Sequence, residues 1–212
     1  MRAVPHVADV THFFVLSAIR SALPHDRPVE YLETGVWKGA ASLLMSRSLF
    51  PTNVIGIDAF STLTLRYEAL WIRSSLAGEA GRVSWIMEHP NSVAALKSVR
   101  SRLKDKMLDM LLIAGESFTS SSRAVREIFA AYEPFVGSGG YIIFDDFMNS
   151  MSAAGVREAV WWMIDHGIIH HHKYEVIGTI LNIAGAGCWA GGDCVFDWEH
   201  TLTSNEFIIR KL

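Results

Sequence analysis

Apolar residues recur along this chain in two alternating patterns, one typical of buried strands and one typical of amphipathic helices. Short continuous apolar runs that end in an acid or a turn indicate strands buried on both faces. Longer segments in which apolar side chains return every three or four positions indicate helices that pack on one side. The pattern predicts strands at residues 31–33, 53–58, 82–87, 107–113, 141–146, 174–183 and 206–212. It predicts helices at residues 7–23, 41–50, 63–76, 93–103, 121–135 and 154–165.

Strands that alternate with helices are typical of an open α/β sheet with helices on both faces. At 212 residues the chain is predicted to form a single domain, residues 1–212. Residues 1–28 contain a lead-in helix that we expect to cover one edge or face of the sheet. Residues 184–205 form a long connection between the last two strands, and connections of this length are usually functional or disordered.

Composition and charge exclude several classes of protein. Half of the residues are hydrophobic and 19% are charged, as in a globular chain, and the net charge of −3 provides no electrostatic footprint for nucleic acid. No apolar run approaches the ~20 residues of a membrane span. Two cysteines, Cys188 and Cys194, are too few for a disulfide framework, and their spacing fits no C-x-x-C zinc unit. We therefore expect a soluble, cytoplasmic protein that binds neither nucleic acid nor membrane.

The first strand leads into a glycine-containing turn that opens a helix. Glu33 ends the strand, and Gly35 and Gly39 follow at a spacing of four. Dinucleotide-binding turns carry G-x-G-x-x-G so that a pyrophosphate can lie on the turn, whereas a carboxylate at Glu33 would repel a diphosphate. The turn therefore favours a cofactor that carries a cation, such as the ammonium and sulfonium of S-adenosylmethionine (SAM). A turn that serves packing alone is the other interpretation.

Asp58 ends the second predicted strand, 25 positions after Glu33. A carboxylate at this place in a βαβ unit can accept both hydrogen bonds of a ribose diol. The alternative is a cap or loop carboxylate. Because SAM and NAD both contain ribose, this position does not separate the two cofactors.

Two segments resemble the class I SAM-dependent methyltransferases. The turn is similar to their motif E-x-G-x-x-x-G-x-S, with Ser42 shifted by one position. The segments L-D-M-L-x-I-x-G at 108–115 and P-x-x-x-x-G-G-Y-I-I-F-D-D at 134–146 resemble a more specific branch. That branch includes catechol O-methyltransferase-like, macrolide O-methyltransferase-like and cephalosporin-hydroxylase-like proteins, and the resemblance covers approximately residues 29–164.

The resemblance implies a Rossmann-like doubly wound sheet of seven strands, mainly parallel with an antiparallel last strand. It implies methyl transfer from SAM to an oxygen of a small-molecule acceptor. Asn91 would stand beside the adenine, although a plain loop in which Ser92 caps the next helix is the other interpretation. The residues expected around the cofactor are Glu33, Thr34, Gly35, Trp37, Gly39, Ser42, Asp58, Ala59, Asn91, Ser92 and Ala114.

Asp145 and Asp146 are the expected catalytic acids, because the carboxyl ends of strands four and five lie beside strand one in such a sheet. Adjacent carboxylates repel each other unless they share a cation or one is protonated. In the resembling branch, acids at these positions bind a divalent metal, here expected to be Mg²⁺, that holds the acceptor oxygens. Ala114 stands where that branch has a third acidic ligand. Either Glu116 replaces it, or the site works without a metal and the two acids are ordinary strand-end residues.

The sequence also allows other functions and other roles for its conspicuous residues. Ala114 favours a catalytically silent SAM-binding module, and a nicotinamide-dependent dehydrogenase with a degenerate turn is a further alternative. The histidines at 170–172 are predicted to lie in a solvated loop, or one of them is the general base. A homodimer formed through the lead-in helix or the late connection is the expected assembly.

Overall fold

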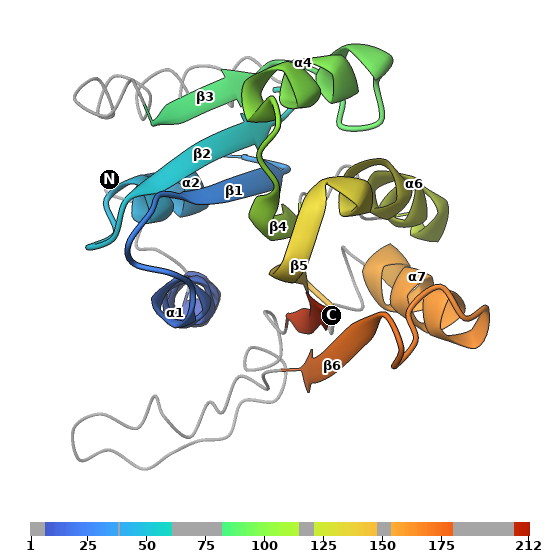
Figure 1. Ribbon diagram of the computed structural model, residues 1–212. Coiled ribbons are helices and arrows are strands. Elements are labelled where there is room, and N and C mark those ends of the chain that lie inside the picture. Colours follow the sequence, from blue (N-terminus) through green and yellow to red (C-terminus); the bar gives the residue numbers. More distant parts are fainter. Residues whose placement is uncertain (1–6, 38, 61–81, 115–120, 148–153, 180–205) are drawn as a thin grey trace.

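The computed structural model describes residues 7–37, 39–60, 82–114, 121–147, 154–179 and 206–212 (Figure 1). A seven-stranded sheet in the order β3-β2-β1-β4-β5-β7-β6 forms its centre. Strands β1 to β5 pair in parallel, and β7 runs antiparallel to both β5 and β6. This confirms the predicted doubly wound sheet. The strands are β1 (Val29–Thr34), β2 (Thr52–Ile57), β3 (Val83–Ile86), β4 (Leu108–Ile113), β5 (Val136–Phe144), β6 (Tyr174–Thr179) and β7 (Phe207–Lys211).

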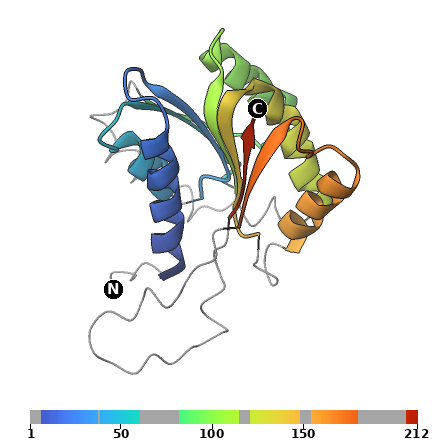
Figure 2. The same ribbon diagram turned by 60° about the horizontal axis from the view of Figure 1, so that its bottom comes forward.

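Helices cover both faces of the sheet (Figure 2). One face carries α1 (Val7–Ala22) and α2 (Ala40–Ser46). The opposite face carries α4 (Val93–Leu103), α6 (Ser122–Tyr132) and α7 (Ala154–Asp165), and a 3₁₀ turn, Glu133–Phe135, follows α6. No helix of the described ranges is both long and apolar enough to span a membrane.

Neighbouring residues of each central strand point to opposite faces and so enter two separate cores. On β4, for example, Met110 and Leu112 pack toward α1, whereas Leu111 and Ile113 pack toward α4 and α6. Both faces are apolar, so these strands appear in the sequence as continuous apolar runs rather than alternating ones.

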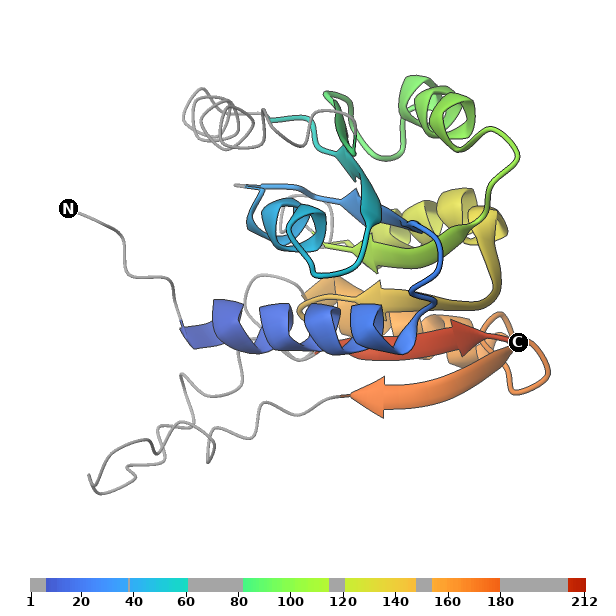
Figure 3. The same cartoon turned by 60° about the vertical axis from the view of Figure 1, so that its left-hand side comes forward.

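The lead-in helix α1 covers a face of the sheet rather than an edge. Val15, Leu16 and Ile19 pack in one core with strand residues that include Leu112 and Ile208. Figure 3 shows α1 lying along the sheet, with its N-terminal end beside the carboxyl ends of the parallel strands and the start of β7. Residues near the start of α1 therefore lie at the edge of the sheet where a ligand of such folds binds.

Two predicted boundaries were wrong. The helix after the first turn ends at Ser46, before the predicted Phe50. The fifth strand begins at Val136 rather than at the predicted residue 141, so residues 137–140 belong to β5. The pairing of β4 with β5 shifts register between Leu108 and Met110, and Gly139 has a φ of 82°, as expected of a strand bulge at glycine. The predicted helix at 63–76 and the connection at 184–205 lie outside the described residues.

Candidate active site

The residues that follow four parallel strands lie at one rim of the sheet. The parallel ladder continues one step beyond the strand ends: Gly35 N–H donates to Ile57 O (2.8 Å) and Ala114 N–H donates to Thr34 O (3.0 Å). In the same way, Asp58 N–H donates to Ile86 O (3.1 Å) and Asp145 N–H donates to Ile113 O (3.0 Å). The structure thus brings together the predicted turn, Asp58, Ala114 and Asp145, which are far apart in the sequence.

The turn after β1 needs its two glycines. Gly35 and Gly39 each have a φ of 79°, in the left-handed region that side chains with a Cβ rarely adopt. Trp37, between them, has a φ of 48° and a side chain that is 52% exposed. Strained backbone of this kind clusters at ligand sites, where the surrounding structure must maintain it.

Asp58 holds this turn in place. Its Oδ2 accepts from Trp37 N–H (2.8 Å), and its Oδ1 accepts from Phe60 N–H (2.7 Å). The carboxylate therefore connects the turn after β1 with the turn after β2. Each oxygen keeps a second lone pair, which can accept a hydrogen bond from a ligand hydroxyl. The turn-holding contact to Trp37 was not predicted from the sequence.

Glu33 is a buried acid beneath the turn. Only 3% of it is exposed, and Ser42 Oγ donates to its Oε2 at 2.7 Å. Burial raises the pKa of Glu33 to about 8, an effect that the Ser42 hydrogen bond and the charge of His12 reduce only in part. Within the described residues, no lysine or arginine forms an ion pair with Glu33. A cation placed beside Glu33 would therefore favour its charged form.

A second ionisable cluster stands farther along the rim, built from three separate elements. Ile143 pairs with Ile208 and Phe144 with Phe207 in antiparallel register. Asp145, just after β5, and Glu206, just before β7, therefore lie side by side at the same end of these two strands. His12 reaches them from α1: its Nδ1 lies 2.9 Å from Glu206 Oε1 and 3.4 Å from Asp145 Oδ1. The side chains of His12, Asp145 and Glu206 are 12%, 20% and 0% exposed.

The charges of this cluster depend on one another. Burial by itself lowers the pKa of His12, but the charges and hydrogen bonds of Asp145 and Glu206 outweigh it and raise that pKa well above its usual value. For Asp145, burial acts to raise the pKa, but His12 and the N–H of Asp146 outweigh it and lower that pKa. The arrangement can bind a proton or another cation between two carboxylates.

Sequence reasoning missed His12 and Glu206. A signal for each is visible in hindsight, since His12 stands three, four and seven positions before Val15, Leu16 and Ile19 on the apolar side of α1. Glu206 stands two positions before Ile208 and so points to the same face of the sheet. An ionisable residue in phase with an apolar face is a candidate for a buried site.

The other predicted cofactor residues have ordinary local roles in this structure. Thr34 is buried and donates its hydroxyl to Leu112 O (3.3 Å). Ser92 caps α4 by accepting from Ala95 N–H (3.0 Å), which confirms the capping interpretation. Asn91 is exposed and donates to Glu127 Oε2 (3.2 Å). Ala59 is half-buried beside Asp58, and Glu116 lies outside the described residues.

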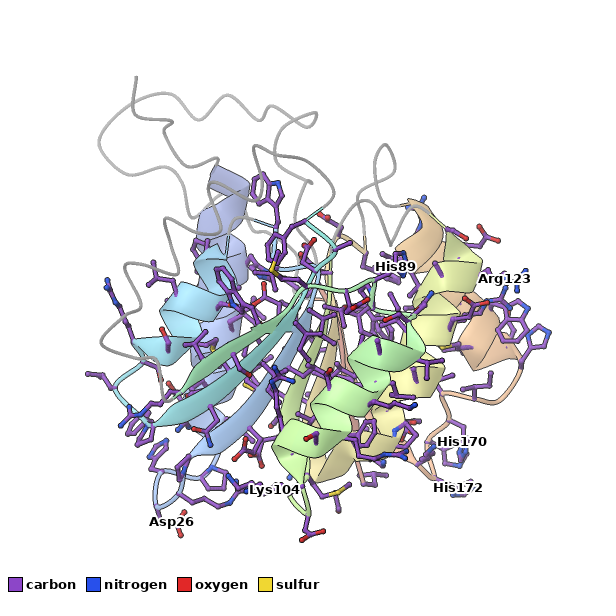
Figure 4. The ribbon with its side chains drawn as sticks, turned by 90° about the horizontal axis from the view of Figure 1, so that it is seen from above. Asp26, His89, Lys104, Arg123, His170 and His172 are labelled. Atoms are coloured by element: carbon purple, nitrogen blue, oxygen red, sulfur yellow. The ribbon has the colours of Figure 1, made fainter. Side chains whose placement is uncertain are left out.

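The histidines at 170–172 are exposed, as predicted, and they precede β6. Because β6 and β5 are both antiparallel to β7, the start of β6 lies at the amino end of the parallel strands. Figure 4 shows His170 and His172 toward the end of the molecule that carries Asp26 and Lys104, away from His89. These histidines therefore lie at the opposite end of the parallel strands from the residues that were predicted to hold the cofactor and the acceptor.

Comparison with known proteins gives few relatives in sequence and many in structure. No family model matches the chain. Uncharacterized protein R132 of Acanthamoeba polyphaga mimivirus is 26% identical over 203 residues, which cover 94% of this chain and 86% of that protein.

Several solved methyltransferases share the fold. The O-methyltransferase TomG from Streptomyces achromogenes, solved with SAM, has a TM-score of 0.63 and 13% identity, covering 94% of this chain and 79% of its own. An rRNA methylase from Streptococcus thermophilus has a TM-score of 0.60 and 9% identity, covering 99% of both chains. The N-methyltransferase NodS from Bradyrhizobium japonicum has a TM-score of 0.58 and 10% identity, covering 96% of both. This chain therefore has the class I SAM-dependent methyltransferase fold, which these proteins use with different acceptors.

Proposed function

We propose that this protein is a SAM-dependent methyltransferase that moves a methyl group to an oxygen of a small-molecule acceptor. The observation that carries the proposal is the buried carboxylate of Glu33 beneath a turn whose Gly35 and Gly39 are both left-handed. Asp58 stands beside that turn with lone pairs free for hydroxyl donors. These groups suit a ligand that combines a cationic amino-acid end with a ribose.

The charge of Glu33 separates SAM from a phosphate-bearing cofactor. A buried acid whose pKa lies near 8 gains its negative charge most easily when a cation binds beside it. A diphosphate at the same place would instead keep Glu33 in its neutral form and would be repelled by nearby Asp58. This argues against the nicotinamide-dependent dehydrogenase as an alternative.

Catalysis would depend mainly on positioning. When bound, SAM supplies a methyl group on a sulfonium that is already activated for transfer. Glu33, Gly35 and Gly39 would hold its amino-acid end, and Asp58 would accept hydrogen bonds from its ribose. Asp145 and Asp146, two strands away on the same rim, would orient the acceptor and assist the loss of its proton.

A small acceptor fits the charge of the rim better than RNA does. Glu33, Asp58, Asp145 and Glu206 all lie at the carboxyl ends of the strands or beside them, and the chain carries a net charge of −3. A polynucleotide binds through cationic contacts to its phosphates, which these carboxylates would oppose. The resemblance at 134–146 and the similarity in fold to the O-methyltransferase TomG support an oxygen as the acceptor atom.

The resemblance also implies Mg²⁺ at Asp145 and Asp146. These two acids would supply the oxygen ligands that Mg²⁺ prefers, but Ala114, 6% exposed on the neighbouring strand, offers none. Asp146 also has a φ of 58° and donates its N–H to Asp145 Oδ1 (2.9 Å). The described part of the expected ligand set therefore contains two acids in place of three.

Calorimetry with S-adenosylhomocysteine (SAH) and with NAD tests the cofactor class. We expect one SAH to bind per chain and NAD to give no measurable heat. Binding of NAD in place of SAH would overturn the proposal and favour the dehydrogenase. Addition of Mg²⁺ to the SAH titration tests whether the cofactor and metal sites are coupled.

Ala114 favours one second candidate, a catalytically silent SAM-binding module. This candidate also predicts SAH binding, so a turnover assay must separate the two. Release of SAH from SAM with a panel of phenols, catechols and sugar hydroxyls, with and without metal, would support the methyltransferase. SAH binding without turnover on any acceptor would support the silent module.

A further inference from the structure

Three ionisable side chains from distant parts of the chain converge at the carboxyl rim. One ligand atom each from His12, Asp145 and Glu206 lies within 4.8 Å of the other two. His12 belongs to α1, Asp145 follows β5, and Glu206 precedes β7, so none of the three is held there by its sequence neighbours alone. The sheet register and the packing of α1 together produce this arrangement.

The cluster contains fewer hydrogen-bond donors than carboxylate oxygens that could accept from them. A single ring nitrogen, His12 Nδ1, faces both Asp145 Oδ1 and Glu206 Oε1. One N–H can donate well to only one of these oxygens. Glu206 is fully buried, and its Oε2 has no hydrogen-bond partner among the described residues. A buried carboxylate oxygen without a partner is costly unless a cation or a donor is brought to it.

We propose that His12, Asp145 and Glu206 bind a divalent transition-metal ion, with Mn²⁺ as the working example. One imidazole nitrogen and two carboxylate oxygens form a donor set that first-row transition metals accept, whereas Mg²⁺ prefers oxygen ligands alone. With a neutral imidazole, the two carboxylates carry a charge of −2 that such an ion neutralises. Glu206 Oε2, a buried atom without a hydrogen-bond partner in the described part of the chain, is the atom that most directly favours a bound cation.

This ligand set differs from the acid pair that the resemblance implies. Asp145 is shared by both sets, but Asp146 is not part of the three-residue cluster. The ring of His12 and the carboxylate of Glu206 replace Asp146 and the acid that is absent at Ala114. The site is open toward solvent on the side of Asp145, whose side chain is 20% exposed, so an ion can enter there.

The metal would lie close to the proposed cofactor site. Ala114 N–H donates to Thr34 O and Asp145 N–H donates to Ile113 O, so Asp145 lies on the same rim as the turn after β1, two strands away. If the proposed function holds, the ion could bind the acceptor oxygen beside the cofactor and lower its pKa. Binding of the ion itself does not require that function.

Spin-echo spectroscopy of bound Mn²⁺ tests the proposal directly. The protein is stripped with EDTA, dialysed and titrated with Mn²⁺. The background carries H170Q, H171Q and H172Q, since these exposed histidines could bind metal adventitiously. We expect one Mn²⁺ per chain and the nitrogen modulation of a coordinated imidazole. The proposal would be overturned if Mn²⁺ bound without nitrogen modulation. It would also be overturned if Mn²⁺ did not bind stoichiometrically.

Variants then identify the ligands. His12→Gln should abolish the nitrogen modulation, and both His12→Gln and Glu206→Gln should weaken Mn²⁺ binding by about 100-fold or more. Asp146→Asn distinguishes this ligand set from the acid pair that the resemblance implies, and should change the affinity by less than about threefold because Asp146 lies outside the cluster. Asp165→Asn, at an exposed position, is the matched control and should leave the affinity unchanged. Circular dichroism confirms that each variant is folded. Unchanged affinity in folded His12→Gln, or a large loss in Asp146→Asn alone, would overturn the assignment.

A titration with SAH on the same samples separates this proposal from the proposed function. Mn²⁺ binding with imidazole modulation but no SAH binding would retain the metal site and reject the methyltransferase. SAH binding without Mn²⁺ binding would retain the cofactor site and reject the metal site.

Discussion

Buried acids lie at both ends of the parallel strands, the amino edge and the carboxyl edge, but the groups that surround these acids differ. At the amino edge, Asp109 and Glu30 are neutralised by cations of the chain itself. At the carboxyl edge, Glu33 and Glu206 are buried without a lysine or arginine partner in the described part of the chain. The acids of the amino edge are neutralised within the protein, whereas the acids of the carboxyl edge have too little positive charge beside them.

At the amino edge, both carboxylate oxygens of Asp109 accept hydrogen bonds from cationic or backbone donors. Its two oxygens accept from Arg27 Nη1 (2.8 Å) and Nη2 (2.6 Å), and Oδ2 also accepts from Glu30 N–H (2.9 Å). Glu30 Oε1 in turn accepts from Lys106 Nζ (2.6 Å) and from Asn53 Nδ2 (2.8 Å). These contacts connect the starts of three strands, which is a structural role.

A cavity of about 680 Å³ also lies at the amino edge, lined by residues that include Arg27, Asp109 and Arg210. Arg27 and Asp109 in its walls are already paired with each other, and Arg210 pairs with Glu175. The edge that we propose to be functional is therefore distinguished by unneutralised buried charge rather than by a hollow in the surface.

The largest effect should come from the pH dependence of Glu33. Its pKa rises from 4.5 to about 8 on folding, so its contribution to stability is fully present below about pH 4.5 and is lost as the pH rises toward 8. Relative to Glu33→Gln, the wild-type free energy of unfolding should therefore fall by about 3 kcal/mol between pH 5 and pH 8. Urea unfolding of both proteins at several pH values measures this difference. Parallel stability curves would show that Glu33 is already ionised.

The same ionisation should appear in ligand binding. If the ammonium of SAH binds beside Glu33, binding at pH 7 should release close to one proton, because the cation lowers the pKa of the acid. Calorimetry in two buffers of different ionisation enthalpy measures the number of protons released. Glu33→Gln should release none from this position, and equal release in both proteins would remove Glu33 from the cofactor site.

Asp58→Ala should weaken SAH binding by about 100-fold, or about 2.7 kcal/mol, because two charge-assisted hydrogen bonds to the ribose are lost. The substitution also removes the acceptor for Trp37 N–H and could disturb the turn. A 2′-deoxy analogue of SAH resolves this ambiguity. Removing the hydroxyl should reduce affinity for the wild type but not for Asp58→Ala, and an equal loss in both would contradict a ribose contact.

Asp109→Ala should lower the free energy of unfolding by about 2 kcal/mol and leave SAH affinity unchanged. The substitution leaves the buried N–H of Glu30 without its acceptor, and the ion pair adds little because Arg27 is 51% exposed. Denaturant unfolding and SAH calorimetry measure the two quantities. Asp105→Ala, at an exposed position, is the control and should change neither. A loss of SAH affinity in Asp109→Ala would remove the distinction between the two edges.

Asn91→Ala should have the smallest effect, a change in SAH affinity of less than about threefold. Its amide is exposed and donates to Glu127, a surface contact of small net value. A loss of tenfold or more, measured by the same calorimetry, would instead support the predicted contact with the adenine.

The first turn and the order of elements could be predicted because each depends on residues close in sequence. Apolar runs and helical spacing locate the strands and helices, and Glu33, Gly35 and Gly39 mark a single strand-turn-helix unit. Asp58 and Asp145 reach the same rim because each ends a strand of one parallel sheet. The fifth strand was predicted to begin at residue 141 instead of Val136, since a glycine such as Gly139 occurs both in turns and in strand bulges and only the pairing with β4 distinguishes them.

The sequence alone therefore determined the sheet, the glycine-containing turn after β1 and the acids at the strand ends. Only the tertiary structure decided that His12 meets Glu206, 194 positions later, beside Asp145. That meeting depends on which face α1 covers and on the insertion of β7 between β5 and β6. Neither is encoded in a local pattern, because both result from the packing of whole elements against each other.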